Sequence, residues 1–321
     1  MSTSAASGRS FFTRGFSTDS LDDSKTAGVS KTSGFSSLRY HIFAKPPMGL
    51  SRLLILTALA SLALVGSALS GKKLPQVLAH RGASGSAPET TLAAYRLALA
   101  LKVDFLELDV QMSRDGQLVA IHDTLVDRTT DGKGAVGEMT LEQLRRLDAG
   151  SWFNRAFPDR ARPEFAGERI PTLEEIIQLA RPARAGLYIE TKNPELYPAN
   201  FESKILDLVR RNHFEKRVVI QSFDARSIEK VRRLAPDVPI ALLVETLQDD
   251  PVEATLRAGS RELAIKYNLL TPEIAARARG RGLALTVWTV DDEESMRRMI
   301  DLGVDRIITN FPERLNHLIG R

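Results

Sequence analysis

The stretch Asp104-Phe-Leu-Glu-Leu-Asp-Val-Gln-Met-Ser-Arg-Asp-Gly-Gln-Leu-Val-Ala-Ile-His122 reads as two strands joined by a tight turn. Asp115-Gly116 is a two-residue hairpin signal. It predicts that Leu118–His122 folds back on Asp104–Val110, with Arg114 opposite Gln117 and Asp109 opposite His122. Residues two apart on a strand point to the same face, so Glu107 and Asp109 lie together. The stretch therefore predicts a strand with two carboxylates on one face and a histidine beside them.

The same type of apolar run recurs through the chain and alternates with amphipathic stretches, a pattern typical of βα units and a parallel sheet. The other expected strands are Val77–His80, Leu187–Thr191, Val218–Ser222, Ile240–Val244, Leu263–Lys266, Leu283–Trp288 and Arg306–Thr309. The expected helices are Thr91–Leu101, Leu173–Arg181, Phe201–Asn212, Ala225–Leu234, Pro251–Ala258, Pro272–Arg281, Glu293–Leu302 and Glu313–Ile319. If the hairpin strand is an extension, eight strands remain, which predicts an α/β fold of the TIM (β/α)₈ barrel type.

Residues 123–169 interrupt this alternation and carry little strand pattern. They contain a short helical pattern near Thr140–Leu147 and the aromatic residues Trp152, Phe153 and Phe157. We interpret this segment as a small insertion standing over the C-terminal mouth of the barrel.

The net charge of the chain comes from its N-terminal segment. The 321 residues hold 44 Lys and Arg against 40 Asp and Glu. Residues 1–71 contain seven basic and three acidic side chains, which leaves 37 of each in residues 72–321. A nucleic-acid-binding face needs an excess of basic residues, so we expect no nucleic-acid partner, although a balanced total leaves a local patch open. The absence of cysteine excludes disulfides, thiolate metal sites and cysteine nucleophiles.

The first 70 residues carry their own patterns. Residues 1–47 include eleven serines and show no helical or strand period, so we expect a disordered extension. Leu53–Leu69 then runs seventeen residues without a charge, the short limit for a membrane span.

Two main interpretations of residues 48–70 stay open, and a third is that the protein is soluble and internal. With Arg52 before the apolar run and Ala68-Leu69-Ser70 after it, the segment is typical of a signal peptide, with Met1 or Met48 as the start. We then expect export to the periplasm or the exterior after cleavage near Ser70. The alternative is an uncleaved anchor that brings residues 53–69 into the membrane. In both cases residues 71–321 form the folded domain.

Polar residues gather where the expected barrel strands end, which is where barrel enzymes carry their chemistry. They are His80 and Arg81 after the first strand, Glu107 and Asp109 on the second, His122 on the hairpin strand, and Glu190 and Lys192 on the fourth. Carboxylates on a buried face cost free energy unless they are paired or bind a cation. Oxygen ligands alone favour one hard divalent cation, Mg²⁺ or Ca²⁺.

Each of these residues also has a purely structural interpretation. His80 can be a packed strand-end histidine, Glu107 and Asp109 can pair with basic side chains inside the barrel, and Lys192 can simply neutralise Glu190. Two histidines, three carboxylates, an arginine and a lysine at one mouth are harder to explain by packing, so we favour a catalytic site.

An ordered set of motifs at these residues resembles the glycerophosphodiester phosphodiesterase family. The motifs are His80-Arg-Gly-Ala-Ser-Gly-Ser-Ala-Pro-Glu-Thr-Thr91, Phe105-Leu-Glu-Leu-Asp-Val110, Val119-Ala-Ile-His-Asp123, Arg128-Thr-Thr130, Ile170-Pro-Thr-Leu173, Ile189-Glu-Thr-Lys192, Val287-Trp-Thr-Val290 and Val304-Asp-Arg-Ile-Ile-Thr309. The resemblance covers about residues 75–315. Two positions depart from the family pattern: Thr90 stands where Asn is usual, and Asn310 where Asp is common.

The resemblance implies a TIM-barrel enzyme that cleaves small-molecule glycerophosphodiesters into an alcohol and sn-glycerol 3-phosphate with one divalent cation. It implies the following roles: metal ligands Glu107, Asp109 and Glu190; acid–base pair His80 and His122; phosphate contacts Arg81 and Lys192; support of the first loop by Glu89. We take His80 as the base and His122 as the acid. The nucleophile is either water or a neighbouring hydroxyl of the substrate.

Several features of the substrate and the assembly stay open. We expect the insertion, Trp288 and the loop after Ser222 to set the alcohol preference. One alternative is a phospholipase D-like enzyme that acts on lysophospholipids or sphingolipids. Another is a non-catalytic, membrane-tethered binding module. The sequence indicates no oligomeric state.

Overall fold

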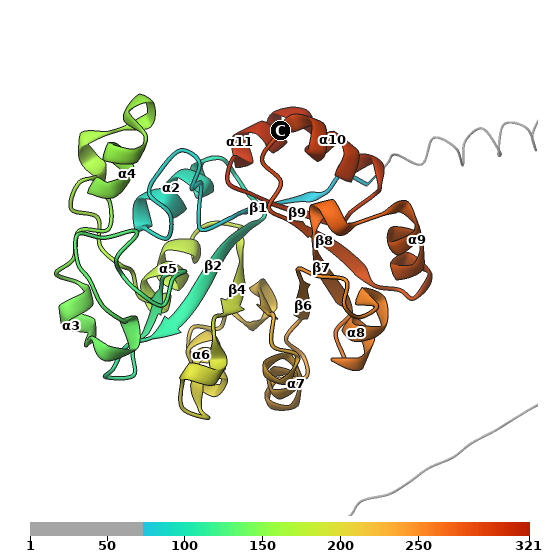
Figure 1. Cartoon of the computed structure of the whole chain (residues 1–321), viewed down its shortest axis with the longest axis horizontal. Coiled ribbons are helices and arrows are strands. Elements are labelled where there is room, and N and C mark those ends of the chain that lie inside the picture. The colour runs from blue at the N-terminus through green and yellow to red at the C-terminus, as the bar shows by residue number, and fades with distance from the viewer. Residues whose placement is uncertain (1–72) are drawn as a thin grey trace, which may run out of the picture. The chain divides into compact units, whose positions relative to one another are not determined.

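Eight parallel strands hydrogen-bond in a closed ring in the computed structural model, which describes residues 73–321 (Figure 1). Going round the ring, they are β1 (Gln76–Ala79), β2 (Phe105–Met112), β4 (Gly186–Thr191), β5 (Val218–Ser222), β6 (Ile240–Val244), β7 (Glu262–Lys266), β8 (Ala284–Trp288) and β9 (Arg306–Thr309). Pairing of β1 with both β2 and β9 closes the ring. The predicted TIM barrel is confirmed.

A layer of helices surrounds the strands, as Figure 1 shows. They are α2 (Leu92–Ala100), α5 (Leu173–Ala180), α6 (Phe201–Arg211), α7 (Ala225–Leu234), α8 (Pro251–Arg257), α9 (Pro272–Gly280), α10 (Glu293–Asp301) and α11 (Pro312–Leu318). Thr172 and Glu175 form a capping box at the start of α5, and Gly282 and Gly303 take left-handed conformations beyond α9 and α10. No helix within residues 73–321 is long and apolar enough to cross a membrane. The predictions for residues 1–47 and 48–70 lie outside the described residues.

The hairpin extension is present, but its predicted register is wrong by one residue. Strand β3 (Leu118–Ala120) pairs antiparallel with β2, with Val110 opposite Ala120, so Ile121 rather than His122 bonds to Asp109. The reason is the turn, which has three residues rather than two, because Ser113 pairs with Gln117 and Gly116 adopts a left-handed φ of 77°.

The insertion follows β3 and packs on the side of the barrel next to α2 and α5 (Figure 1). It contains α3 (Leu141–Leu144), α4 (Ser151–Ala156) and short 3₁₀ turns at Val136–Glu138, Pro158–Arg160 and Pro163–Phe165. Phe153 and Phe165 are buried against Ala94 of α2. The short helix predicted near Thr140–Leu147 is present as α3. The insertion borders one side of the mouth, beside β1.

Strand alternation divides the core into two layers. Odd-numbered residues of β4, such as Leu187 and Ile189, face the helices, and even-numbered ones, such as Tyr188 and Glu190, face the barrel interior. Interior side chains towards the strand starts fill the barrel: Tyr188 donates to Glu262 at 2.7 Å, and Arg306 pairs with Glu262 at 2.8 Å. This closed lower layer leaves open space at the strand ends.

The loop after β1 depends on a glycine. Gly82 has φ 82°, and a Cβ there would lie 2.7 Å from the backbone carbon of Ala94 in α2. We expect Gly82→Ala to lower the free energy of unfolding by about 2–4 kcal/mol, measured by urea titration. The control is Gly282→Ala, where φ is 71° but no atom lies within 4 Å. It should cost about 1 kcal/mol. Equal losses would show that the contact with α2 does not constrain the loop.

Candidate active site

Three carboxylates from two adjacent strands lie close together inside the barrel mouth. Glu107 and Asp109 come from β2, and Glu190 is the register partner of Asp109 on β4. All three are buried, and one oxygen from each lies within 4.8 Å of the others. Oδ2 of Asp109 is buried and accepts no hydrogen bond. Such a set of hard oxygen donors fits a divalent cation.

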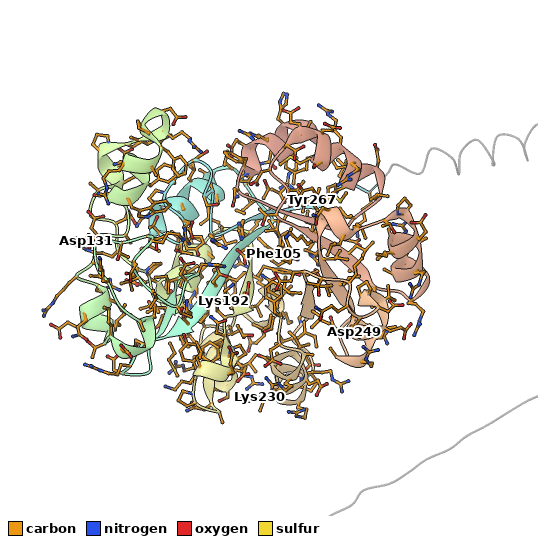
Figure 2. All side chains as sticks on the ribbon, viewed as in Figure 1. Phe105, Asp131, Lys192, Lys230, Asp249 and Tyr267 are labelled. Carbon is orange, nitrogen blue, oxygen red and sulfur yellow. The ribbon has the colours of Figure 1, made fainter. Side chains whose placement is uncertain are left out.

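Two basic side chains partly balance these three negative charges. Nε of Arg81 lies 3.2 Å from Oδ2 of Asp109, and its backbone nitrogen donates to Glu107 at 3.0 Å. Nζ of Lys192 lies 3.0 Å from Glu190 and 3.5 Å from Asp109. Figure 2 places Lys192 inside the ring of helices. Gln221 donates to Glu107 at 2.9 Å, so every carboxylate has at least one polar neighbour.

The surroundings separate the acidities of the three carboxyl groups. Burial, together with the charge of Asp109, raises the pKa of Glu107 well above its usual range and that of Glu190 to about 7. Burial acts on Asp109 too, but Arg81 and Lys192 outweigh it and lower the pKa of Asp109 to about 2. Burial thus disfavours ionisation of Glu107 and Glu190, and a bound cation would favour it.

His80 follows β1 directly and is held by Asn310. Nδ1 of His80 lies 2.7 Å from Oδ1 of Asn310, whose amide nitrogen donates to Asp291 at 2.7 Å. Because that oxygen can only accept, Nδ1 carries the proton and Nε2 is left with a lone pair. Burial, with the charge of Arg81, lowers the pKa of His80 to about 3. Nε2 lies 4.0 Å from Glu107, so a neutral histidine with a free ring nitrogen stands at the carboxylate cluster.

The Nδ1 atom of His122 contacts a carboxylate, whereas that of His80 contacts an amide. Nδ1 of His122 lies 2.6 Å from Asp123, and its Nε2 lies 2.9 Å from Nζ of Lys192. Burial lowers the pKa of His122, and its contact with the Lys192 ammonium makes Nε2 an acceptor here. Despite the shifted register, Lys192 connects His122 to Asp109, so the two histidines lie on either side of the cluster.

A network of ion pairs ties the first loop to the insertion. Glu89 binds Arg81 at 2.9 Å and Arg128 at 2.8 Å, and Arg128 also binds Asp123 at 2.6 Å. Burial raises the pKa of Glu89, but Arg128 and Arg81 outweigh it and lower that pKa overall. Thr90 beside it is buried with φ 55°, a conformation that Asn tolerates better than a β-branched residue. The departure from the family pattern at this position thus falls on a strained residue.

A cavity of about 460 Å³ opens above these groups. Its polar wall includes both histidines, Glu107 and Glu190. Its apolar wall includes Phe223 and Trp288, whose rings meet edge to face at 5.4 Å. Nε1 of Trp288 donates to the carbonyl of Ala264, which fixes the indole. A second hollow of about 340 Å³ lies on the other side of His80 and is walled by Trp152 and Phe157 of the insertion.

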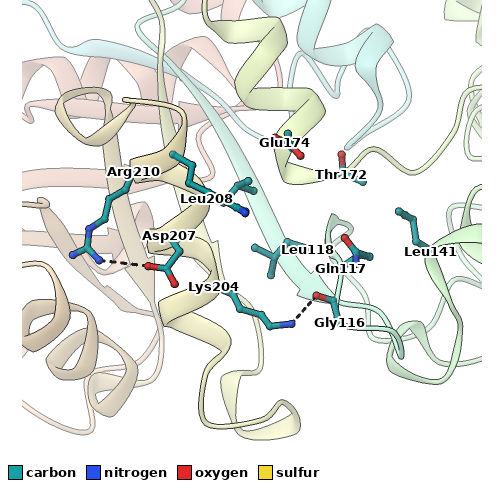
Figure 3. A pocket seen from close by; sticks show the side chains of 11 residues that line it. Gly116, Gln117, Leu118, Leu141, Thr172, Glu174, Lys204, Asp207, Leu208 and Arg210 are labelled. Carbon is teal, nitrogen blue, oxygen red and sulfur yellow. Dashed lines mark hydrogen bonds and ion pairs between the residues drawn. The ribbon is translucent and has the colours of Figure 1, made fainter.

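A larger hollow of about 770 Å³ lies away from the mouth, between the hairpin turn and helices α5 and α6 (Figure 3). Its side chains are occupied with one another: Lys204 donates to the carbonyl of Gly116 at 3.0 Å, and Arg210 pairs with Asp207 at 3.6 Å. No histidine or buried carboxylate lines it among the described residues, so its size alone does not make it the active site.

All of the candidate residues lie at the mouth: His80, Arg81, Glu89, Glu107, Asp109, His122, Glu190, Lys192 and Trp288. No role was predicted for Asp123, Asn310 or Gln221, whereas Phe223 lies in the loop after Ser222 that was expected to set the alcohol preference. Asp123 adjoins a candidate histidine, which is a usable signal. The contact between Asn310 and His80 joins residues 230 positions apart and follows only from barrel closure.

Comparisons with known proteins show which family this chain resembles over most of its length. Residues 80–314 match the model of the glycerophosphoryl diester phosphodiesterase family. The chain is 40% identical over 257 residues to a glycerophosphodiester phosphodiesterase of Bacillus subtilis, covering 77% of this chain and 87% of that one. It is 41% identical over 245 residues to one of Caldanaerobacter subterraneus, covering 76% and 98%. A solved phosphodiesterase of Oleispira antarctica, in complex with the product sn-glycerol-3-phosphate, aligns with TM-score 0.71 and 28% identity over 77% of this chain and 98% of that one.

The close packing of the three carboxyl groups should lower the stability of the metal-free protein. In metal-free protein at pH 8, Glu190→Gln removes a buried negative charge beside Asp109, so we expect it to raise the free energy of unfolding by about 1–3 kcal/mol. In the wild type, the pKa of Glu190 is about 7 when folded and near 4.5 when unfolded. The folded state therefore binds the extra proton, and metal-free stability should rise as the pH falls from 8 to about 5. In the Gln variant this rise should flatten.

Thermal unfolding with EDTA, and then with Mg²⁺ or Ca²⁺, checks this prediction. A divalent cation should stabilise the wild type and the control Glu245→Gln, which lines the cavity outside the cluster, but not Glu190→Gln. A Gln variant that is less stable without metal, yet still stabilised by the cation, would contradict the assignment of these carboxylates as ligands.

Proposed function

The chain belongs to the glycerophosphoryl diester phosphodiesterase family, and on that premise we propose that it hydrolyses glycerophosphodiesters to an alcohol and sn-glycerol 3-phosphate. One observation carries the proposal. Two histidines, two basic side chains, Glu107 and Glu190 line a single cavity at the barrel mouth, and the buried Asp109 lies within 4.8 Å of both carboxylates. A phosphodiester is anionic and has a poor leaving group. Basic side chains and a bound cation can neutralise its charge, and histidines can transfer the protons that attack and departure require.

One divalent cation, Mg²⁺ or Ca²⁺, would be held by Glu107, Asp109 and Glu190. Their oxygens are close enough to share an ion, and Oδ2 of Asp109 accepts no hydrogen bond, with Nε of Arg81 3.2 Å away. When bound, such a cation neutralises charge on phosphate oxygens during attack.

Arg81 and Lys192 would contact the phosphate oxygens of the substrate. Both are more than four-fifths buried at the cluster, and the carboxylates keep both side chains charged, since they raise the pKa of each against the effect of burial. Fixed positive charges in a site that excludes water stabilise the charge that develops in the transition state. Lys192 would exchange its contact with His122 for one with a phosphate oxygen.

The histidines would move the protons. His80 is neutral with its Nε2 lone pair at the cluster, which suits a base that activates the nucleophile, either water or a substrate hydroxyl. His122 has Asp123 on Nδ1, a partner that stabilises an imidazolium and so supports protonation of the leaving alkoxide at Nε2.

The cavity favours small, water-soluble diesters over lysophospholipids or sphingolipids. Its volume of about 460 Å³ suits a head group and a glycerol, and polar groups form much of its wall. The two aromatic side chains Phe223 and Trp288 give the alcohol or glycerol an apolar surface. Every proposed ligand and histidine is present, which argues against a non-catalytic binding module.

Release of glycerol 3-phosphate from glycerophosphocholine tests the proposal. We expect activity that needs Mg²⁺ or Ca²⁺ and stops with EDTA. Glu107→Gln should lose at least about 100-fold in kcat/KM, because it removes a ligand, while Glu245→Gln should keep most of the activity. A metal-loaded protein that releases nothing from any glycerophosphodiester would disprove the function.

The acid role of His122 makes a separate prediction. His122→Ala should lose about 10²–10⁴-fold on glycerophosphocholine, whose choline alkoxide needs a proton. It should lose far less on a p-nitrophenyl ester, whose phenolate leaves unaided. His80→Ala should lose similar activity on both esters. A His122→Ala variant with equal losses on the two esters would refute the acid role.

A further inference from the structure

The end of the barrel opposite the mouth, where the strands begin, carries a basic hollow. Its volume is about 760 Å³, and it lies between the segments that lead into β2, β4 and β5. One acidic side chain, Asp104, lines it beside a set of basic ones: Lys102, Arg184, Lys216, Arg217 and Arg321. We call these five basic residues and Asp104 the basic foot.

Two of the basic side chains have structural roles. Arg217 donates to backbone carbonyls at the end of α5, including that of Ala180 at 2.9 Å, and Arg321 pairs with Asp104 at 2.6 Å. In contrast, the side chains of Lys102, Arg184 and Lys216 are exposed and make no hydrogen bond or ion pair with any residue of 73–321. Stabilisation of helix C-termini therefore does not account for them.

The positive charge extends beyond the hollow along the same end of the molecule. Arg211 and Arg232, near the ends of α6 and α7, and Arg261 before β7 are all exposed. Besides Asp104, the acidic side chains in the segments that lead into strands are Glu215, Asp237 and Asp305, and Lys73 binds Asp305 at 2.8 Å. Basic groups thus outnumber acidic ones at this end.

The mouth has the opposite charge. The loop after β6 carries Glu245, Asp249 and Asp250, and residues 291–294 after β8 are all acidic. Residues 72–321 are neutral in total, so the barrel has a positive end and a negative end. Such a molecule takes a definite orientation in an electric field.

The chain outside the structure joins at the positive end. Lys73 is the first described residue, and β1 begins three residues later with its start at the foot. Leu69, the last residue of the uncharged run, is four residues before Lys73. Four residues reach at most about 14 Å. If residues 53–69 enter a bilayer, this end of the barrel must lie close to the bilayer surface.

We propose that the basic foot docks on a membrane surface rich in anionic phospholipids and holds the mouth away from it. Lys and Arg near such a surface are attracted to the lipid phosphates, and the acidic mouth is repelled. Nucleic acid is the less suitable partner, because the adjoining segment is apolar. Combined with the proposed function, this orientation means that the enzyme takes its diesters from the water rather than from the lipids beneath it.

The absence of cysteine allows a direct test with the full chain. Single substitutions Asp237→Cys at the foot and Asp249→Cys at the mouth, both exposed, each carry a fluorescent donor (Figure 2 labels Asp249). The protein is reconstituted in vesicles of phosphatidylcholine, with or without phosphatidylglycerol, that contain an acceptor-labelled lipid. With anionic lipid we expect at least about twofold more energy transfer from position 237 than from position 249. The difference should shrink without anionic lipid or in about 0.5 M NaCl.

Charge-reversed variants complete the test. The triple variant Lys102→Glu, Arg184→Glu and Lys216→Glu should abolish the difference. The control triple variant Lys133→Glu, Arg155→Glu and Lys266→Glu makes the same charge change at exposed sites elsewhere and should preserve it. Unfolding temperatures show whether each variant is folded. Equal transfer from both positions in anionic vesicles, or greater transfer from position 249, would overturn the proposal. A labelled DNA duplex that binds through the same three residues and displaces the foot from vesicles would also overturn it.

Discussion

Three carboxylates lie inside the barrel where water screens them poorly, and their mutual repulsion determines what must surround them. Arg81 bends back from the first loop to Asp109, Lys192 reaches across from β4, and Gln221 donates to Glu107. The closed barrel makes this arrangement possible, because hydrogen bonds on both sides of each strand hold the side chains in place. A fold with a free sheet edge at β2 and β4 would let the carboxylates move apart. The cation proposed here would relieve the same repulsion.

The two histidines differ in the partner of their Nδ1 atoms. Nδ1 of His122 meets a carboxylate, and Nδ1 of His80 meets the amide of Asn310. An uncharged amide stabilises an imidazolium less than a carboxylate does, so His80 stays neutral while Asn310 fixes the tautomer that leaves Nε2 free to accept a proton. The Asn at a position where family members commonly carry Asp is therefore compatible with catalysis. With an amide rather than a carboxylate at Nδ1, the imidazolium form of His80 is less stabilised by its partner than that of His122.

Much of the fold follows from local patterns. Alternation of apolar strands with capped helices was enough to predict eight barrel strands and the hairpin extension, because each element depends on its own residues. The register of the hairpin was not predictable in the same way, since a left-handed Gly116 adds one residue to the turn. The carboxylate cluster was predictable because residues two apart on a strand share a face. The contacts of Asn310 and Gln221 were not, because barrel closure brings them to the site from distant strands.

The ion pairs of Arg128 limit which parts of the insertion can be substituted without moving the catalytic residues. Arg128 lies in the insertion, yet it holds Asp123 behind one histidine and Glu89 behind Arg81. The start of the insertion is thus part of the catalytic frame, while the later part with Trp152 and Phe157 walls the second hollow and packs against α2. The insertion cannot be exchanged as a whole module between relatives without disturbing catalysis. Selection or engineering for a new alcohol should act on residues after Arg128, where a change in shape leaves the histidine and the arginine in place.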